Sequence, residues 1–524
     1  MAEEDKLLNI NEASKWASEY LHRKVTKSNI EYLIQYGRIN KYGNNGYTYV
    51  SLSELINYYD KLKKEKFEIK DSDINWTLAF DNYTEAERTK HVHRLHPYKG
   101  KFIPQLVEYF LDSHTDEYKK EVYFHKGDIV IDPFCGSGTT LVQCNELGIH
   151  AIGIDISEFN SLISNCKVSK YNLVELYEYV NNLTYALKNY LSSSKTLEFE
   201  EKLNEKLNEF NNKYFPSPEF KYLINRKEID ENIYAKEKEN EFLKIYNELL
   251  KEYDIEVFTE KTERFIDKWF IKPVKEELEF LSNKIKKIEN KKTRDILIII
   301  LSRTMRSCRA TTHYDLATLK EPIYTTYYCH KHGKICKPLF SILKWWETYS
   351  KDIIKRLDEF NKIRTNTFQY CITGDSRYVD IYCELNKTNN QFYELVKSKK
   401  IKGIFSSPPY VGLIDYHEQH AYAYELFGFK RNDDKEIGPL YKGQNKNAKD
   451  EYIQGISYVL INCKKFMCED YDIFLVANDK YELYPKIAEK SGMYIVEYFK
   501  RPVLNRTEKD NNPYSETIFH LKAK

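Results

Sequence analysis

GDIVIDPFCGSGTTLVQCNELGIHAIGIDIS, residues 127–157, contains two short apolar runs separated by a glycine-rich turn and a helical pattern. The first run, 129–131, ends in Asp132, and the second ends in Asp155. Gly136 and Gly138 lie where the first strand would turn into the helix. The order strand, helix, strand is the unit from which parallel sheets are built. This segment therefore predicts an α/β fold with a parallel sheet.

The same rhythm returns near residue 370, in FQYCITGDSR, IKGIFSSPPY, YDIFLVAND, YIVEYFKRPV and ETIFHLKAK. The sequence between, 171–370, is charged and has long helical patterns. We predict that a sheet begun before residue 170 is completed after residue 370. The predicted fold class is α/β, a Rossmann-like sheet with a helical insertion and a small N-terminal domain. The predicted boundaries are 1–68, 69–170, 171–370 and 371–524.

The glycine-rich turn predicts a nucleoside site. Glycines let the backbone approach a ligand closely, and a helix N-terminus adds unpaired N–H groups. Asp155, at the end of the next strand, is placed to accept hydrogen bonds from ribose hydroxyls. The third glycine of the dinucleotide fingerprint and the Gly-Lys-Ser/Thr phosphate loop are both missing from this segment. A nucleoside without a pyrophosphate fits better.

A second corner is IFSSPPY, residues 404–410. Two consecutive prolines offer no N–H donor and make the chain rigid. The Ser407 hydroxyl and the Pro408 carbonyl could accept the hydrogens of an amine, and the Tyr410 ring could stack on a planar ligand.

DPFCGSGTT and SPPY together resemble the motifs of the amino-methylating DNA methyltransferases, which use S-adenosylmethionine. HPYKGKFIPQL (96–106), TGDSR (373–377) and FLVAND are similar to further motifs of that family, in the same order. The resemblance covers roughly 90–170 and 370–524. It implies cofactor contacts for His96, Tyr98, Lys101, Phe102, Asp132, Pro133, Phe134, Gly136, Gly138, Thr139, Asp155, Ile156, Asp375 and Ser376. It implies a catalytic loop of Ser407, Pro408, Pro409 and Tyr410.

The resemblance implies methyl transfer to an exocyclic amine of a base that is swung out of duplex DNA. In this family a loop beginning with Ser usually accompanies N4 of cytosine, so Ser407 favours N4-cytosine over the alternative, N6-adenine. Three other classes stay open: a DNA-binding regulator with an inactive methyltransferase fold, an RNA methylase and a protein methylase. A role in a restriction–modification or related defence system is expected, with a cognate nuclease as a candidate partner.

Residues 7–67 predict a separate module of two helices, a hairpin around 44–46 and a last helix. This order resembles the winged helix-turn-helix of the MerR and excisionase families. Between residues 22 and 46 the sequence contains five basic residues and one acidic residue, Glu31. Local positive charge suits phosphate contact. The predicted DNA-binding residues are Arg23, Lys24, Lys27, Arg38 and Lys41 here, and Arg303, Arg306 and Arg309 in the insertion, the expected target-recognition region.

Overall composition limits the remaining inferences. The 81 Lys and Arg against 79 Asp and Glu leave a net charge of +2, so nucleic-acid binding cannot be argued from net charge. The longest apolar run, 296–301, is far too short to cross a membrane, and no charged-then-apolar leader is present, so a cytoplasmic protein is expected. Cys308, His313, Cys329, His330, His332 and Cys336 could ligate zinc, but without a Cys-x-x-Cys knuckle no metal site is predicted.

Overall fold

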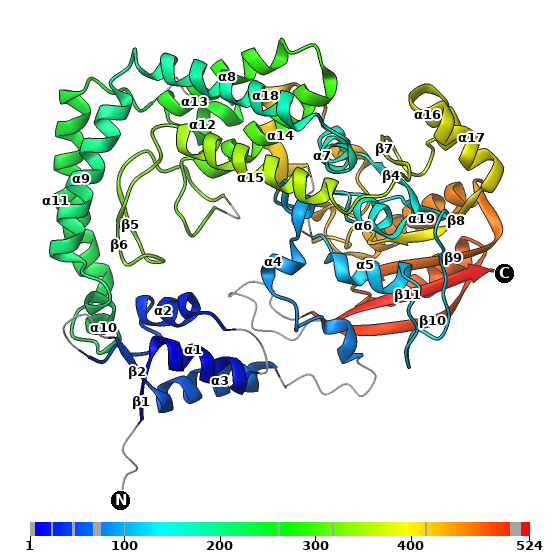
Figure 1. Ribbon diagram of the computed structural model, residues 1–524, viewed down its shortest axis with the longest axis horizontal. Helices are drawn as coiled ribbons and strands as arrows, with labels where there is room; N and C mark the ends of the chain where they lie inside the picture. The colour runs from blue at the N-terminus through cyan, green and yellow to red at the C-terminus, as the bar shows by residue number, and fades with distance from the viewer. Residues whose placement is uncertain are drawn as a thin grey trace, which may run out of the picture. The chain divides into compact units, whose positions relative to one another are not determined.

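Seven strands form the main sheet of the protein, in the order β10-β11-β9-β8-β3-β4-β7 (Figure 1). Neighbours among β7, β4, β3, β8 and β9 run parallel, whereas β11 is antiparallel to both β9 and β10. The strand bounds are β3 Ile129–Asp132, β4 His150–Asp155, β7 Gln369–Thr373, β8 Ile401–Ser406, β9 Met467–Ala477, β10 Met493–Pro502 and β11 Ser515–Ala523. The prediction of one sheet shared by the two ends of the chain is confirmed.

The computed structural model describes residues 6–21, 25–43, 48–66, 75–98, 100–258, 263–316, 319–413, 417–503 and 515–524. The chain divides into two compact units. Unit 1 comprises Met1–Lys70, Leu187–Glu277 and Ser307–Ile342, and unit 2 comprises Asp71–Ala186, Leu278–Arg306 and Leu343–Lys524. The predicted insertion, 171–370, is thus divided between the units. None of the helices in the described ranges combines the length and hydrophobicity that crossing a bilayer requires.

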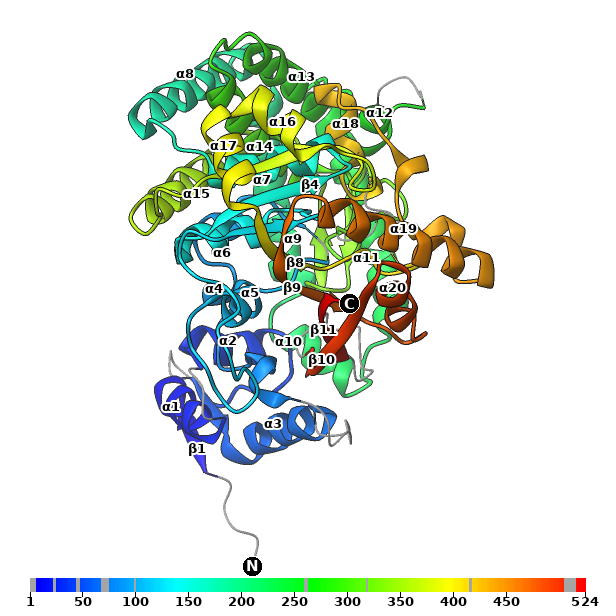
Figure 2. The same cartoon turned by 90° about the vertical axis from the view of Figure 1, so that its right-hand side faces the viewer.

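The sheet of unit 2 is buried on both faces, because alternate side chains of a strand point to opposite sides. Ile131 and Ile404 belong to a core on one face, whereas the Phe405 ring lies 5.9 Å from the ring of Phe110 on the other. The first face packs on α16 Ile381–Thr388, α17 Asn390–Lys399, α19 Lys446–Lys464 and α20 Tyr484–Lys490 (Figure 2). Helices α5 Pro104–Leu111, α6 Thr139–Leu147 and α7 Glu158–Val168 complete the predicted strand–helix alternation.

Other helices complete unit 2 or run from one unit into the other. Those within unit 2 are η1 Trp76–Ala79, α4 Glu85–Arg88, η2 His91–Arg94, α15 Leu343–Asn361, η3 Glu418–His420, α18 Ala421–Phe427, η4 Asp433–Lys435 and η5 Leu440–Lys442. Those shared by the units are α8 Leu173–Leu191, α13 Lys272–Lys286 and α14 Lys291–Cys308.

The N-terminal module lies within unit 1. It consists of β1 Leu7–Asn9, α1 Ile10–Tyr20, α2 Lys27–Gln35, β2 Tyr49–Ser51 and α3 Leu52–Lys66. Thr26 caps α2. The predicted turn at 44–46 lies outside the described residues, but Tyr42 and Tyr49 on either side of it form an antiparallel bridge. The module has a core of its own, which includes Ala13, Ala17, Ile30 and Leu55.

The rest of unit 1 contains α9 Thr196–Tyr214, α10 Glu219–Asn225, α11 Glu231–Glu252 and α12 Phe265–Trp269, with a small hairpin of β5 Tyr327–Cys329 and β6 Lys334–Cys336. Helices α9 and α11 lie side by side and contact the hairpin (Figure 1). Helix α10 contacts the N-terminal module: the Tyr222 hydroxyl accepts a hydrogen bond from the backbone N–H of Lys41, 2.8 Å away.

Candidate active site

The loops that follow β3 and β8 meet at one edge of the sheet. Ile131 of β3 pairs in parallel with Ile404 of β8, and Asp132 pairs with Gly153 of β4. Because the carboxyl ends of neighbouring parallel strands lie at the same edge, the glycine turn and the proline corner are brought together. The two predicted corners, far apart in the sequence, therefore share one site.

Asp132 connects these two loops through hydrogen bonds. Its carboxylate accepts hydrogen bonds from Ser406 Oγ at 2.6 Å and Thr140 Oγ1 at 2.7 Å, and from the backbone N–H of Phe134 at 3.2 Å. Only 1% of the residue is exposed, and burial raises its pKa to about 6. Asp132 therefore holds β3, β8 and the start of α6 together rather than facing the ligand.

The glycine turn needs its glycines for two reasons. Gly136 and Gly138 have φ of +51° and +75°, in the left-handed region that suits glycine. A Cβ at Gly138 would lie 2.9 Å from the Ser164 side chain, and one at Gly136 would lie 3.1 Å from the Tyr98 ring. A side chain at either position would strain the backbone, and at Gly138 it would also force Ser164 to shift.

A pocket of about 880 Å³, counted to its open mouth, lies over these loops. Thirteen predicted residues line it: Tyr98, Lys101, Phe102, Pro133, Phe134, Gly136, Thr139, Asp155, Ile156, Asp375, Ser376, Ser407 and Pro409. Five others lie outside this lining: His96, Asp132, Gly138, Pro408 and Tyr410.

Asp155 is a buried acid in the lining of the pocket. Its carboxylate accepts from the backbone N–H groups of Gly136 at 2.7 Å and Ser157 at 2.9 Å, and from Asn160 Nδ2 at 3.1 Å. Burial nevertheless raises its pKa to about 7. The second carboxylate, Asp375, forms a 2.6 Å ion pair with Arg377. Asp155 and Asp375 therefore lie in different surroundings within one pocket.

The sequence did not single out several lining residues. Ser137 and Asn160 are each 2% exposed, and among the described residues Ser137 Oγ and Asn160 Oδ1 have no hydrogen-bond partner. Buried polar atoms are normally satisfied, so these two are available to a ligand. Their closeness to the glycine turn and to Asp155 could have indicated them. Lys435, Glu436 and Ile437 come from a segment that carried no recognisable signal.

Two residues that precede α5, His96 and Lys101, contact backbone carbonyls near the pocket. His96 is fully buried, its ring Nδ1 is 2.9 Å from the carbonyl of Pro97, and burial holds its pKa well below the usual value. Lys101 Nζ donates to the carbonyl of His93 at 3.0 Å, and burial lowers its pKa to about 8. The helix after the proline corner buries Tyr422.

In the proline corner, Ser407 and Pro409 are half-buried and line the pocket, and Pro408 is buried. The Tyr410 hydroxyl donates to Glu516 Oε1 of β11 at 2.7 Å. The ring is half-buried against the sheet core. Its hydroxyl bond and the prolines fix the tyrosine beside the pocket.

The predicted DNA-binding residues have different environments. Lys27, Arg38 and Lys41 are exposed, and Arg23 and Lys24 lie outside the described residues.

The insertion arginines are less accessible. Arg303 and Arg309 are each 8% exposed; Arg303 donates to Asp352 at 2.6 Å and Arg309 to the carbonyl of Leu316 at 2.6 Å. Arg306 is half-buried. The structural bonds of Arg303 and Arg309 argue against the predicted DNA contact.

Comparison with known proteins adds independent information. A family model described as DNA methylase matches residues 6–165. The chain is 50% identical over 527 residues to the type II methyltransferase M.MjaII of Methanocaldococcus jannaschii, a match that covers 99% of this chain and 97% of that protein. It is 31% identical over 135 residues to the type II methyltransferase M.MvaI of Kocuria varians, covering 26% of this chain and 28% of that protein. It is 31% identical over 118 residues to the type II methyltransferase M.BsoBI of Geobacillus stearothermophilus, covering 22% and 21%.

Proposed function

The chain belongs to the type II DNA methyltransferases of the N6/N4 family, whose methyl donor is S-adenosylmethionine, and we propose that it methylates the N4 amine of cytosine in duplex DNA. The observation that carries this proposal is the shared pocket, in which Ser407 and Pro409 of the proline corner lie with Asp155 and Asp375. One loop can hold the donor while the other presents the acceptor.

The pocket has the chemistry that the donor requires. Asp155 and Asp375 offer carboxylates, Ser137 Oγ and Asn160 Oδ1 offer unsatisfied polar atoms, and Phe102, Phe134 and Ile156 offer apolar surface. Asp155 would accept the ribose hydroxyls and Asp375 would meet the adenine amino group. The bound donor supplies an electrophilic methyl group on a positively charged sulfur.

The proline corner prepares the acceptor. The lone pair of an exocyclic amine is delocalised into the base, so its hydrogens must be held by acceptors before it can attack. Ser407 Oγ and the Pro408 carbonyl are those acceptors, and the two prolines keep them in place. Tyr410 stacks on the base after it leaves the duplex. Water takes the proton released by the methylated amine.

The choice of cytosine rests on Ser407, since family loops beginning with Ser usually accompany that base. N6 of adenine is the alternative amine, because the same acceptors would hold its hydrogens. The N-terminal module, through exposed Lys27, Arg38 and Lys41, is the proposed DNA contact in unit 1. Type II enzymes belong to restriction–modification systems, and a cognate nuclease is the proposed partner.

The test is to express the protein in cells without the modification, digest their DNA and identify the modified nucleosides by mass. N4-methylcytosine is expected, and it should be missing from cells that express the Ser407→Ala variant. N6-methyladenine in its place would assign the chain to the other branch of the family. A digest with neither product, from cells that contain folded protein, would contradict the proposal.

A further inference from the structure

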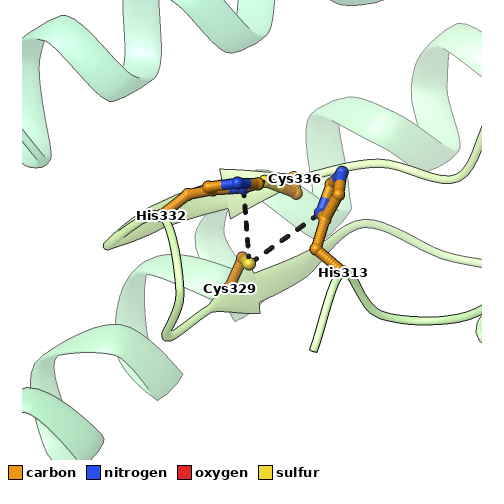
Figure 3. A group of neighbouring side chains, drawn as sticks. All are labelled: His313, Cys329, His332 and Cys336. Atoms are coloured by element: carbon orange, nitrogen blue, oxygen red, sulfur yellow. Dashed lines mark hydrogen bonds between the residues drawn. The ribbon is translucent and has the colours of Figure 1, made fainter. Parts of the chain in front are cut away.

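A group of cysteine and histidine side chains in unit 1 has no part in methyl transfer. Cys329 ends strand β5, His332 lies in the turn of the hairpin, and Cys336 ends strand β6. His313 comes from the loop that precedes the hairpin, and its ring lies 4.5 Å from the ring of His332, measured between centroids. The four side chains converge on one point (Figure 3).

The distances within this group match a tetrahedral metal site. Sγ of Cys329 lies 3.5 Å from Nδ1 of His332 and 3.8 Å from Nδ1 of His313, and Sγ of Cys336 lies 3.7 Å from Nδ1 of His332. All four ligand atoms lie within 4.8 Å of one another. With Zn–S near 2.3 Å and Zn–N near 2.05 Å, ligands at tetrahedral angles are separated by about 3.3–3.8 Å.

We propose that His313, Cys329, His332 and Cys336 bind one zinc ion. Two thiolates and two imidazoles are a donor set that zinc prefers, and four protein ligands leave no open position, which is typical of structural sites. Cys329 and Cys336 are 3% and 8% exposed, and both cysteines are free.

One neighbouring group competes for a ligand atom. The Tyr327 hydroxyl lies 2.9 Å from Nδ1 of His313, and an ion bound to that nitrogen would displace the hydroxyl. The Tyr327 hydroxyl keeps a second partner, because it accepts from the backbone N–H of His313 at 3.2 Å. The other two residues that the sequence offered are outside the group: Cys308 lies in α14, and Nδ1 of His330 is 3.4 Å from Glu231.

The hairpin is small. Each strand has three residues, and the local apolar cluster consists of Tyr327, Cys329 and Cys336 with Ile323 against it. Short two-stranded hairpins are marginal in water, so a metal that ties its ends and turn together would add to the stability that its contacts with neighbouring helices provide. The hairpin in turn contacts α9, where Asn211 exchanges two 2.9 Å hydrogen bonds with the backbone of Ile335.

A second group, His91, His93 and Glu146 of unit 2, does not make the same case. Lys90 Nζ already lies 2.6 Å from the Glu146 carboxylate, and that cation would repel a metal ion. The group also offers only three ligands. Zinc is therefore assigned only to the group at the hairpin.

The test measures metal in the full chain, purified from zinc-supplemented cells without chelator, by inductively coupled plasma mass spectrometry. One zinc per chain is expected, and Cys329→Ser and Cys336→Ser should each lose it. Cys383→Ser is the matched control, because Cys383 is an exposed free cysteine outside the group, and it should keep its zinc. A wild-type chain without zinc, or zinc retained by both hairpin variants, would overturn the proposal.

A second measurement does not depend on the variants folding. Metal-free wild-type chain is titrated with Co²⁺, and tetrahedral coordination with two thiolates should give intense visible bands together with sulfur-to-metal charge transfer. Added Zn²⁺ should abolish these bands, because it binds such a site more tightly than Co²⁺ does. The spectrum of Co²⁺ surrounded by water alone would overturn the proposal, whatever the methyltransferase activity.

Discussion

Burial and hydrogen bonding act in opposite directions on Asp155. Burial dominates and raises its pKa to about 7, so in the ligand-free chain the carboxyl is about half protonated near neutral pH. A raised pKa means that its contribution to folding is full at low pH and is lost as pH rises through about 7. A cationic donor whose hydroxyls bind the carboxylate favours the ionised form and releases the proton.

We therefore expect the affinity for S-adenosylmethionine to fall as pH is lowered from about 8 to about 6, by up to about tenfold per unit below the pKa. Isothermal titration calorimetry at several pH values measures this. The Asp155→Asn variant should bind more weakly and lose most of the pH dependence. Equal wild-type affinity across this range would show that Asp155 does not contact the donor.

Tyr410 makes a second residue-scale prediction. Tyr410→Ala removes the stacking surface, and we expect kcat/KM on duplex DNA to fall about tenfold to a hundredfold. Tyr410→Phe is the matched control: it loses the bond to Glu516 but keeps the ring, so most activity should remain. S-adenosylmethionine affinity should be unchanged in both. Full turnover by the alanine variant would contradict the stacking role.

Most of the pocket lining could be predicted because it lies inside short motifs. The strand that ends in Asp155 is recognisable from the sequence, as are the turns that contain Gly136 and Ser407. Long-range partners could not be predicted. Nothing local indicates that Arg303 is bound by Asp352, forty-nine residues away, and the sequence wrongly suggested an accessible guanidinium. The role of Asp132 as a link between strands depends on Ser406, which only the sheet brings near it.

At the scale of elements, Asp132 is where β3, β8 and α6 are joined. Asp132→Ala leaves the Ser406 hydroxyl buried without its acceptor and leaves Thr140 Oγ1 only the carbonyl of Phe405 at 3.4 Å, so we expect a loss of roughly 2–4 kcal/mol in the free energy of unfolding. Urea denaturation followed by circular dichroism measures it. Asp450→Ala, at an exposed position of α19, should cost within about 0.5 kcal/mol. Equal stability of the two variants would contradict the linking role.

The strands themselves were predictable, because β3, β4 and β8 are short runs that end at turn residues, and the second half of β9 is apolar. Their order across the sheet was not. A strand's sequence records that both faces are buried, but not which neighbour it pairs with. The hairpin of β5 and β6 also escaped prediction, since three-residue strands are too short for an alternating pattern to be recognised.

At the scale of the whole molecule, the exposed basic residues of the N-terminal module lead to a prediction about DNA binding. Replacing Lys27, Arg38 and Lys41 by Ala should weaken binding to duplexes of any sequence, and lower the slope of log K against log salt by up to about 3. Fluorescence anisotropy at several salt concentrations measures both effects, and donor affinity should not change.

The control for this variant replaces three exposed lysines of unit 2, Lys397, Lys486 and Lys490, so that the change in net charge is the same. This second triple variant should keep the wild-type salt slope. If both triple variants lose affinity equally, the effect is one of net charge and the module is not the contact.

The division into units was only partly readable from the sequence. The change in character near residue 170 is real, but 278–306 and 343–361 group with the sheet rather than with the other helices. Helical periodicity shows that a helix has a buried face but does not show what that face packs against. Leu278 and Leu281 form part of such a face on α13. Only three-dimensional contacts make that assignment.

The central place of β8 has a consequence for biosynthesis. It lies between β3 and β9, although β3 leaves the ribosome some 270 residues earlier. Until β8 emerges and inserts, Asp132 has no Ser406 to bind and the pocket has no second wall. A nascent chain that has not yet reached β8 therefore has no assembled pocket, and it can neither hold the donor nor present an amine to it.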